Sequence, residues 1–247
     1  MKKVLSTILL LLLVGYVLFA AITLTGRAEG QLCKGIQLEI QDSLKTGYMS
    51  TTDIAVLLAK KGLNPTGQLL DSVSLQAIES ALETSPLIAS CECYKTISGH
   101  VVVSVECRKP ILRIITHAGE SYYLDEEGEA IAHIAKAVYL PVATGHISLD
   151  FAKEKLLPLA QLLQDDKLWD TQIEQIHVTP RQEIELVPRV GGHIIALGRP
   201  EEYAQKLDSL YTFYEKALKE VGWDRYSRIS LDHQGQVVAT KKEQTPR

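Results

Sequence analysis

The pattern of hydrophobic and polar positions divides the chain into an uncharged N-terminal stretch and a longer part with alternating residues. Residues 4–26 carry no charged side chain, although both flanks do. A helix of 23 residues extends about 34 Å, which is enough to cross a hydrocarbon core of about 30 Å. We therefore expect a single transmembrane helix at residues 4–26, preceded by a cytoplasmic tail at residues 1–3.

A cleaved signal peptide is the alternative interpretation of this stretch. Its apolar core exceeds the roughly 7–15 residues usual in signal peptides, and cleavage after Ala21 would place Phe19 where a small residue is needed. Gly26 and Ala28 offer another cleavage site, but only at the end of an over-long segment. The pattern favours an uncleaved anchor. Lys2 and Lys3 precede it, so the positive-inside rule keeps the N-terminus cytoplasmic and places the C-terminal part outside the cytoplasm.

After a linker at residues 27–34, the periodicity predicts strand, helix, helix, strand, strand over residues 35–107. Alternating residues begin a strand at Ile36, and Ser50 with Asp53 forms a capping-box pattern before the first helix. The second helix is expected at about residues 75–83. Such an order is typical of a small α+β unit with helices on one face of its sheet.

Beyond Lys109 and Pro110 the pattern predicts a larger mixed α/β domain with a mostly antiparallel sheet, ending near residue 241. A helix is expected at residues 151–163 and a longer amphipathic one at residues 201–221. The final hairpin is predicted from strands at residues 227–231 and 236–240. A polar tail, residues 242–247, follows, and we expect it to be mobile.

Composition and charge narrow the classes of function. Hydrophobic residues make up 46% and charged residues 23% of the chain, which is globular rather than disordered. Lys2, Lys3 and Arg27 are the only charges before Glu29, so the net charge of −4 divides into +3 around the anchor and −7 beyond it. An acidic body argues against nucleic-acid binding.

Motifs of known chemistry are missing from the sequence. The seven histidines include no pair spaced by four residues, and there is neither a glycine-rich phosphate loop nor a Gly-x-Ser-x-Gly elbow. The acidic run at residues 125–129 lacks the spacing of a calcium loop and is interpreted as a solvated turn. We therefore expect no enzyme activity, no cofactor, no metal and no small-molecule substrate.

The cysteines leave one structural alternative open. Residues two apart on a strand face the same side, so pairing Cys93 with Val105 would put Cys91 opposite Cys107. A cross-strand disulfide could form there in an oxidising compartment. The other interpretation is that all four cysteines are small buried hydrophobes.

Several motifs together resemble the FtsQ/DivIB family of bacterial cell-division proteins, in a form similar to that of the Bacteroides lineage. Residues 106–114 resemble the junction in which a strand runs through Arg-x-Pro into a second domain. Residues 121–128 resemble a hairpin with tyrosine, Asp, two residues and Gly. Leu197-Gly198-Arg199, followed by Lys206-Leu207, resembles the entry into a late helix, and residues 228–239 resemble the terminal hairpin. The order and spacing of these motifs cover nearly the whole chain.

The resemblance implies a POTRA domain at residues 35–107 and a β domain at residues 108–241. It implies a non-catalytic scaffold in the cytoplasmic (inner) membrane at the division septum, with periplasmic domains and FtsL/FtsB-like partners. In this family a partner adds a strand to the terminal edge. The matching positions are Gly235, Gln236, Val237, Val238, Ala239 and Thr240.

The terminal strand departs from better-known members because residues 236–240 include no aromatic anchor. Without the resemblance it would be a core-facing strand. The sequence leaves two other functions open. One is a POTRA-containing envelope assembly or transport component. Such a protein would need a membrane-embedded second domain, and residues 108–247 are too short and too helical to form one. The other is a thiol-dependent envelope enzyme.

Overall fold

The computed structural model describes residues 10–20, 30–41, 49–134, 139–233 and 235–243. The chain divides into two compact units, residues 1–107 and residues 108–247. The N-terminal unit contains a three-stranded sheet and the C-terminal unit a nine-stranded sheet.

Residues 10–20 form a helix whose side chains are mostly exposed. Within the described residues, no helix has both the length and the apolar character needed to cross a membrane. The predicted tail at residues 1–3 and the remainder of the predicted span, residues 4–9 and 21–26, lie outside the described residues.

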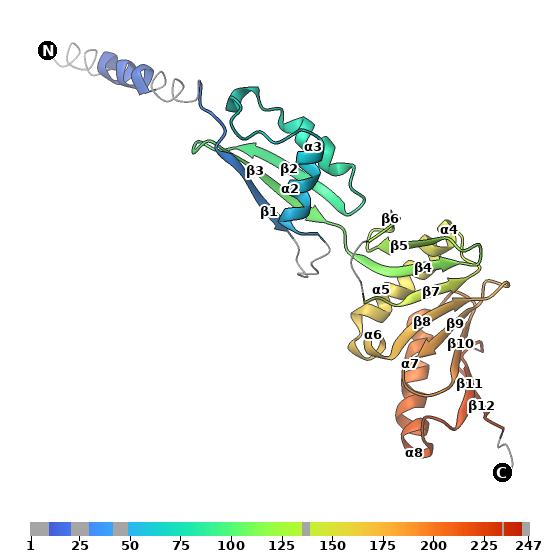
Figure 1. The fold of residues 1–247 in the computed structure, drawn as a ribbon. Coiled ribbons are helices and arrows are strands. Elements are labelled where there is room, and N and C mark those ends of the chain that lie inside the picture. Colours follow the sequence, from blue (N-terminus) through green and yellow to red (C-terminus); the bar gives the residue numbers. More distant parts are fainter. Residues whose placement is uncertain (1–9, 21–29, 42–48, 135–138, 234, 244–247) are drawn as a thin grey trace. The chain divides into compact units, whose positions relative to one another are not determined.

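The N-terminal unit follows the predicted order of elements (Figure 1). Its elements are β1 (Gly35–Gln41), α2 (Thr51–Lys60), the 3-10 turn η1 (Leu70–Ser72), α3 (Leu75–Glu83), β2 (Ile88–Lys95) and β3 (His100–Cys107). The sheet has the order β1-β3-β2, with β1 parallel and β2 antiparallel to the central strand. Helices α2 and α3 pack against this sheet through one hydrophobic core.

Local sequence explains these elements. The Ser50 side chain accepts a bond from the Asp53 amide while the Asp53 carboxylate accepts one from the Ser50 amide, so the predicted capping box is confirmed. Leu58 of α2 and Leu82 of α3 are fully buried. Alternation along β3 buries Val101, Val103 and Val105 against them.

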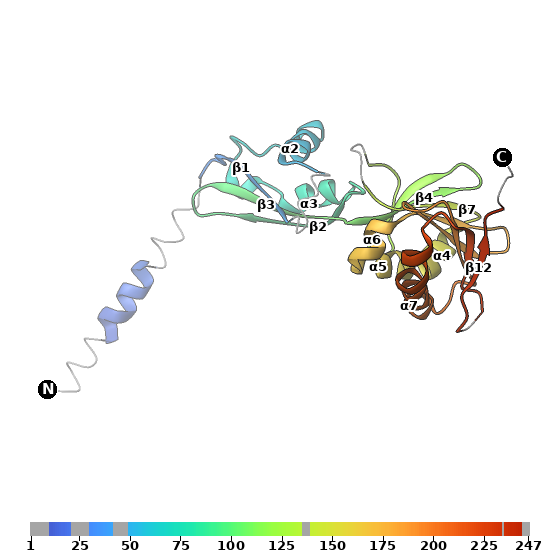
Figure 2. The same ribbon diagram turned by 90° about the horizontal axis from the view of Figure 1, so that it is seen from below.

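The C-terminal unit is a mixed α/β domain (Figures 1 and 2). Its strands are β4 (Pro110–Thr116), β5 (Ser121–Asp125), β6 (Ala130–Ile131), β7 (Val142–Gly145), β8 (Ile173–Val178), β9 (Ile184–Pro188), β10 (Ile194–Gly198), β11 (Tyr226–Ser230) and β12 (Val238–Lys241). They form one sheet in the order β12-β11-β10-β9-β8-β7-β4-β5-β6. Parallel pairing joins β4 to β7, β7 to β8 and β10 to β11, and the other neighbours are antiparallel. The sheet is therefore mostly antiparallel, as predicted.

Two helical stretches follow the predicted amphipathic segments. The first comprises α4 (Leu149–Phe151), the π-helical turn η2 (Ala152–Leu156) and α5 (Leu157–Asp165), with α6 (Lys167–Gln172) after it. The second comprises α7 (Tyr203–Phe213), the π-helical turn η3 (Tyr214–Leu218) and α8 (Lys219–Val221). Each stretch contains a π-helical turn that the period of 3.6 residues does not reveal.

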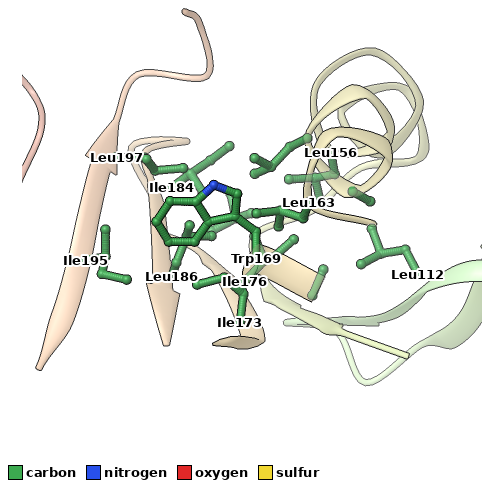
Figure 3. Packing of buried hydrophobic residues seen from close by; sticks show 14 of the residues in the cluster. Leu112, Leu156, Leu163, Trp169, Ile173, Ile176, Ile184, Leu186, Ile195 and Leu197 are labelled. Atoms are coloured by element: carbon green, nitrogen blue, oxygen red, sulfur yellow. The ribbon is translucent and has the colours of Figure 1, made fainter. Parts of the chain in front are cut away.

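Trp169 of α6 lies in the middle of the C-terminal core (Figure 3). Its side chain is almost fully buried. Leucines of the helical stretch face it on one side, and isoleucines and leucines of β8, β9 and β10 on the other. This packing joins the helical stretch to β8, β9 and β10, and β10 is the neighbour of the terminal hairpin in the sheet.

Candidate functional site

The terminal hairpin consists of β11 and β12, and β12 is the last strand at its edge of the sheet. Ser230 lies opposite Val238 and Arg228 opposite Thr240. Of the six predicted contact positions, Val238, Ala239 and Thr240 belong to the strand. Gly235, Gln236 and Val237 precede it, and the strand continues to Lys241. The prediction that the strand begins at residue 236 is wrong by two residues, because the Gln236 amide donates to the His233 carbonyl and closes the turn.

Backbone hydrogen bonds determine which groups of β12 face outward. The Leu231 amide donates to the Ala196 carbonyl of β10, so by alternation Ser230 and Arg228 face β12. Their partners Val238 and Thr240 consequently bond back to β11. The intervening residues, Ala239 and Lys241, direct their main-chain amide and carbonyl groups away from β11. No strand of the described chain pairs with that outer side.

Side chains alternate along the same strand. Ala239 packs against the hydrophobic core of the unit, as does Val237 just before the strand. Val238 points to the other face and is 48% exposed. On β11 the exposed Arg228 forms an ion pair with Glu185, at 2.7 Å between Nη2 and Oε1. The edge thus combines unpaired backbone groups with a mixed apolar and charged face.

A hollow of about 360 Å³ lies between the first turn of α7 and the turn of the terminal hairpin. Its lining is mostly polar and includes Arg199, Glu201, Glu202, Lys206, Asp232 and His233. Burial lowers the pKa of Lys206, whose ammonium donates to the Arg199 carbonyl at 2.8 Å. Gly235 and Gln236 line the same hollow, so it adjoins the segment that leads into the edge strand.

Gly198 explains why the Leu197-Gly198-Arg199 motif lies beside this hairpin. Its φ of +71° belongs to the left-handed region, and a Cβ there would lie 2.0 Å from Oδ1 of Asp232. Only glycine lets the end of β10 approach the hairpin turn so closely. Glu202, the residue immediately before α7, has a φ of +56°, a conformation that few non-glycine residues adopt.

The ion pair between Arg108 and Asp125 explains two more of the family motifs, the Arg-x-Pro junction and the hairpin with Asp, two residues and Gly. Asp125 lies at the end of β5 and is only 1% exposed, so the interpretation of residues 125–129 as a solvated turn is wrong for the first of them. It accepts bonds from Arg108 Nη1 at 2.9 Å and from the amides of Glu127 at 3.0 Å and Glu129 at 2.6 Å. Gly128 completes the turn with a φ of +87°. Arg108 of the Arg-x-Pro junction and the Asp-x-x-Gly hairpin are therefore one structural feature.

The structure corrects the predicted register of the cysteines. Cys91 lies opposite Val105 and Cys93 opposite Val103, whereas Cys107 lies opposite Ile88. The turn closes between the Thr96 amide and the His100 carbonyl, and this shifts the pairing by two residues from the predicted one. Cys91 and Cys107 are therefore not opposite each other, as the predicted disulfide requires, and none of the four cysteines forms a disulfide in this structure.

Histidines of the C-terminal unit form two further contacts between titratable groups or aromatic rings. Among the residues that the structure describes, no three or more His, Cys, Asp or Glu side chains could hold a metal ion together. His117 and His146 stack with ring centroids 4.4 Å apart. His193 is buried, and its Nε2 lies 2.9 Å from the Tyr214 hydroxyl. Burial lowers the pKa of His193, opposed in part by the Trp223 carbonyl.

Sequence reasoning missed two parts of this site. Lys241 was placed after the strand, although an apolar–polar alternation alone cannot show where pairing with β11 ends. The charged residues around Arg199 and Lys206 were assigned only to a helix entry. Their meeting with the hairpin depends on a parallel neighbour, β10 beside β11, which leaves no local signal in the sequence.

Comparisons with known families agree with this geometry. A family model described as "FtsQ/DivIB, C-terminal related" matches residues 109–240. A model described as "POTRA-like domain" matches residues 31–106. No curated protein matches the chain.

Proposed function

Since the chain belongs to the FtsQ/DivIB, C-terminal related family, we propose that it is a non-catalytic scaffold of the bacterial division machinery. Residues 4–26 would anchor it in the cytoplasmic membrane, with both folded units in the periplasm. It would gather FtsL/FtsB-like membrane proteins at the septum. The family assignment and the uncharged N-terminal stretch support this role.

The observation that carries the proposed mode of binding is the outer edge of β12. A partner segment would add a strand beside Val238–Lys241 and bond to the outward amide and carbonyl groups of Ala239 and Lys241. The exposed Val238 and Thr240 would contact alternate side chains of that strand. Because the backbone supplies most of the bonds, this mode works without an aromatic anchor in residues 236–240.

Two matched proline variants test this mode. Ala239→Pro removes an outward donor of β12 while sparing the bonds to β11, so it should abolish co-purification of an FtsL/FtsB-like partner. Ala130→Pro is the control at the opposite edge of the same sheet. The Asp125 amide donates to the Glu129 carbonyl, so by alternation the Ala130 amide faces away from β5.

Both variants should retain the wild-type unfolding midpoint of the C-terminal unit, since neither loses a bond within the sheet. Partner recovery that is equal for Ala239→Pro and the wild type would overturn strand addition at β12. Equal loss in both variants would point to a general effect of proline on the sheet. The wider role is tested by depletion: dividing cells should form filaments, and a fluorescent fusion should gather at the septum. Normal division after depletion would contradict the scaffold role.

A further inference from the structure

Three large aliphatic side chains are exposed together at one end of the N-terminal unit. Leu32 is 56%, Leu69 50% and Ile97 100% exposed. They come from three separate segments: the chain before β1, the chain before η1, and the turn between β2 and β3. We call these three residues the apolar tip.

Backbone bonds bring the three segments together. Leu32 and Leu69 are partners in an isolated antiparallel bridge, and the Leu70 amide donates to the Gln31 carbonyl at 2.8 Å. The Gln31 side chain donates to the Ile97 carbonyl at 3.4 Å. The apolar tip is therefore a structured surface and not three unrelated positions. Exposed aliphatic residues that cluster in this way mark an interaction surface.

Charges beside the apolar tip are mostly basic. Lys34 follows Leu32 and is exposed. Lys95 lies two residues before Ile97 and donates to the Asp71 carbonyl at 3.3 Å. The Asp71 carboxylate is the acidic group nearest in sequence to Leu69. Aliphatic side chains bordered by two lysines suit a bilayer with anionic headgroups.

The place of the apolar tip along the chain indicates the same partner. Leu32 lies six positions after Gly26, the end of the uncharged stretch. At no more than about 3.6 Å per residue these positions span at most roughly 20 Å. Figures 1 and 2 both show the turn between β2 and β3 beside the start of β1. The whole apolar tip is thus tethered close to the end of the predicted span.

We propose that the apolar tip inserts into the headgroup region of the lipid bilayer and holds the N-terminal unit on the membrane surface. This inference rests on the anchor at residues 4–26 in the proposed function. Three aliphatic side chains bind a bilayer weakly from solution. A tether this short supplies an effective concentration in the millimolar range, so weak insertion is enough.

The test places a tryptophan reporter at the apolar tip of the full chain. The protein is reconstituted in nanodiscs of phosphatidylcholine and phosphatidylglycerol, with either plain or brominated acyl chains. Ile97→Trp is compared with Ser90→Trp, an exposed site on β2 of the same hairpin that lies seven residues before Ile97 and at most about 23 Å from it. The native Trp169 and Trp223 provide a background that is subtracted using the unaltered protein.

The added emission of Ile97→Trp should shift to the blue and lose at least about half its intensity in brominated lipid, as expected for a depth of about 5–10 Å. Ser90→Trp should lose little. Introducing Leu69→Ser into the Ile97→Trp chain should reduce the quenching, with the circular dichroism unchanged. Equal quenching at positions 97 and 90 would overturn the proposal, as would quenching that needs an added protein partner.

Failure of the anchor is distinguishable from failure of the apolar tip. A chain that remains with the nanodisc through size exclusion, yet shows no quenching at position 97, overturns the inference and leaves the anchor intact. A chain that separates from the nanodisc overturns the anchor and, with it, this inference.

Discussion

Asp125→Ala should destabilise the C-terminal unit strongly, because this buried carboxylate holds the start of the unit together. The change removes an acceptor from Arg108 and from two backbone amides. All three lost bonds have a charged acceptor, and such bonds contribute about 1.5–3 kcal/mol each, so we expect a loss of at least about 3 kcal/mol. Arg108→Ala should cost less, about 1–2 kcal/mol, since the remaining carboxylate keeps both amide donors and the arginine side chain is 22% exposed.

Urea unfolding followed by tryptophan fluorescence measures this difference directly. Trp169 and Trp223 are the only tryptophans of the chain, and both belong to the C-terminal unit, so the signal reports this unit alone. We expect lower midpoints for both variants and the larger shift for Asp125→Ala. A loss below about 1 kcal/mol for Asp125→Ala would refute the reasoning, since one ordinary hydrogen bond could account for it. A larger loss for Arg108→Ala would also refute it.

Further predictions concern other parts of the molecule. Because burial lowers the pKa of His193, its contribution to stability should be complete above about pH 6.5 and be lost as the pH falls, by up to about 1.4 kcal/mol per pH unit. His193→Gln should flatten this slope in urea titrations between pH 5 and 6.5; an unchanged slope would exclude His193 as its source. Gly198→Ala should lower the unfolding midpoint and weaken partner binding, since the new Cβ would collide with Asp232; wild-type values for both would contradict the close approach. Thiol titration of the unfolded, unreduced protein should find four thiols, and two would restore a disulfide.

Much of the fold could be predicted from local patterns in the sequence. The capping box at Ser50 and the strand at residues 121–125 appear in the structure where their residue patterns place them. The capping box depends only on residues within three positions, and the strand at residues 121–125 pairs with its neighbours in sequence, β4 and β6. The Asp-x-x-Gly turn likewise requires one carboxylate and one residue with positive φ.

The pairing of strands that are distant in sequence or irregular could not be predicted from the sequence. The bulge between Ile88 and Ser90 and the turn closed by Thr96 determine the register of the cysteines, and alternation is the same for any register shifted by two. The parallel neighbours β10 and β11 are separated by a whole helical stretch. For that reason the hollow between α7 and the terminal hairpin could not be foreseen from the residues around Arg199.

The central claim is that a partner strand bonds to the outer edge of β12. Amide hydrogen exchange, read by NMR on the full chain in nanodiscs with and without an FtsL/FtsB-like partner, tests it most directly. Without the partner, the amides of Val238 and Thr240 should exchange slowly because they bond to β11, and those of Ala239 and Lys241 should exchange fast. With the partner, Ala239 and Lys241 should become protected. A partner that binds while both amides continue to exchange fast would contradict the account.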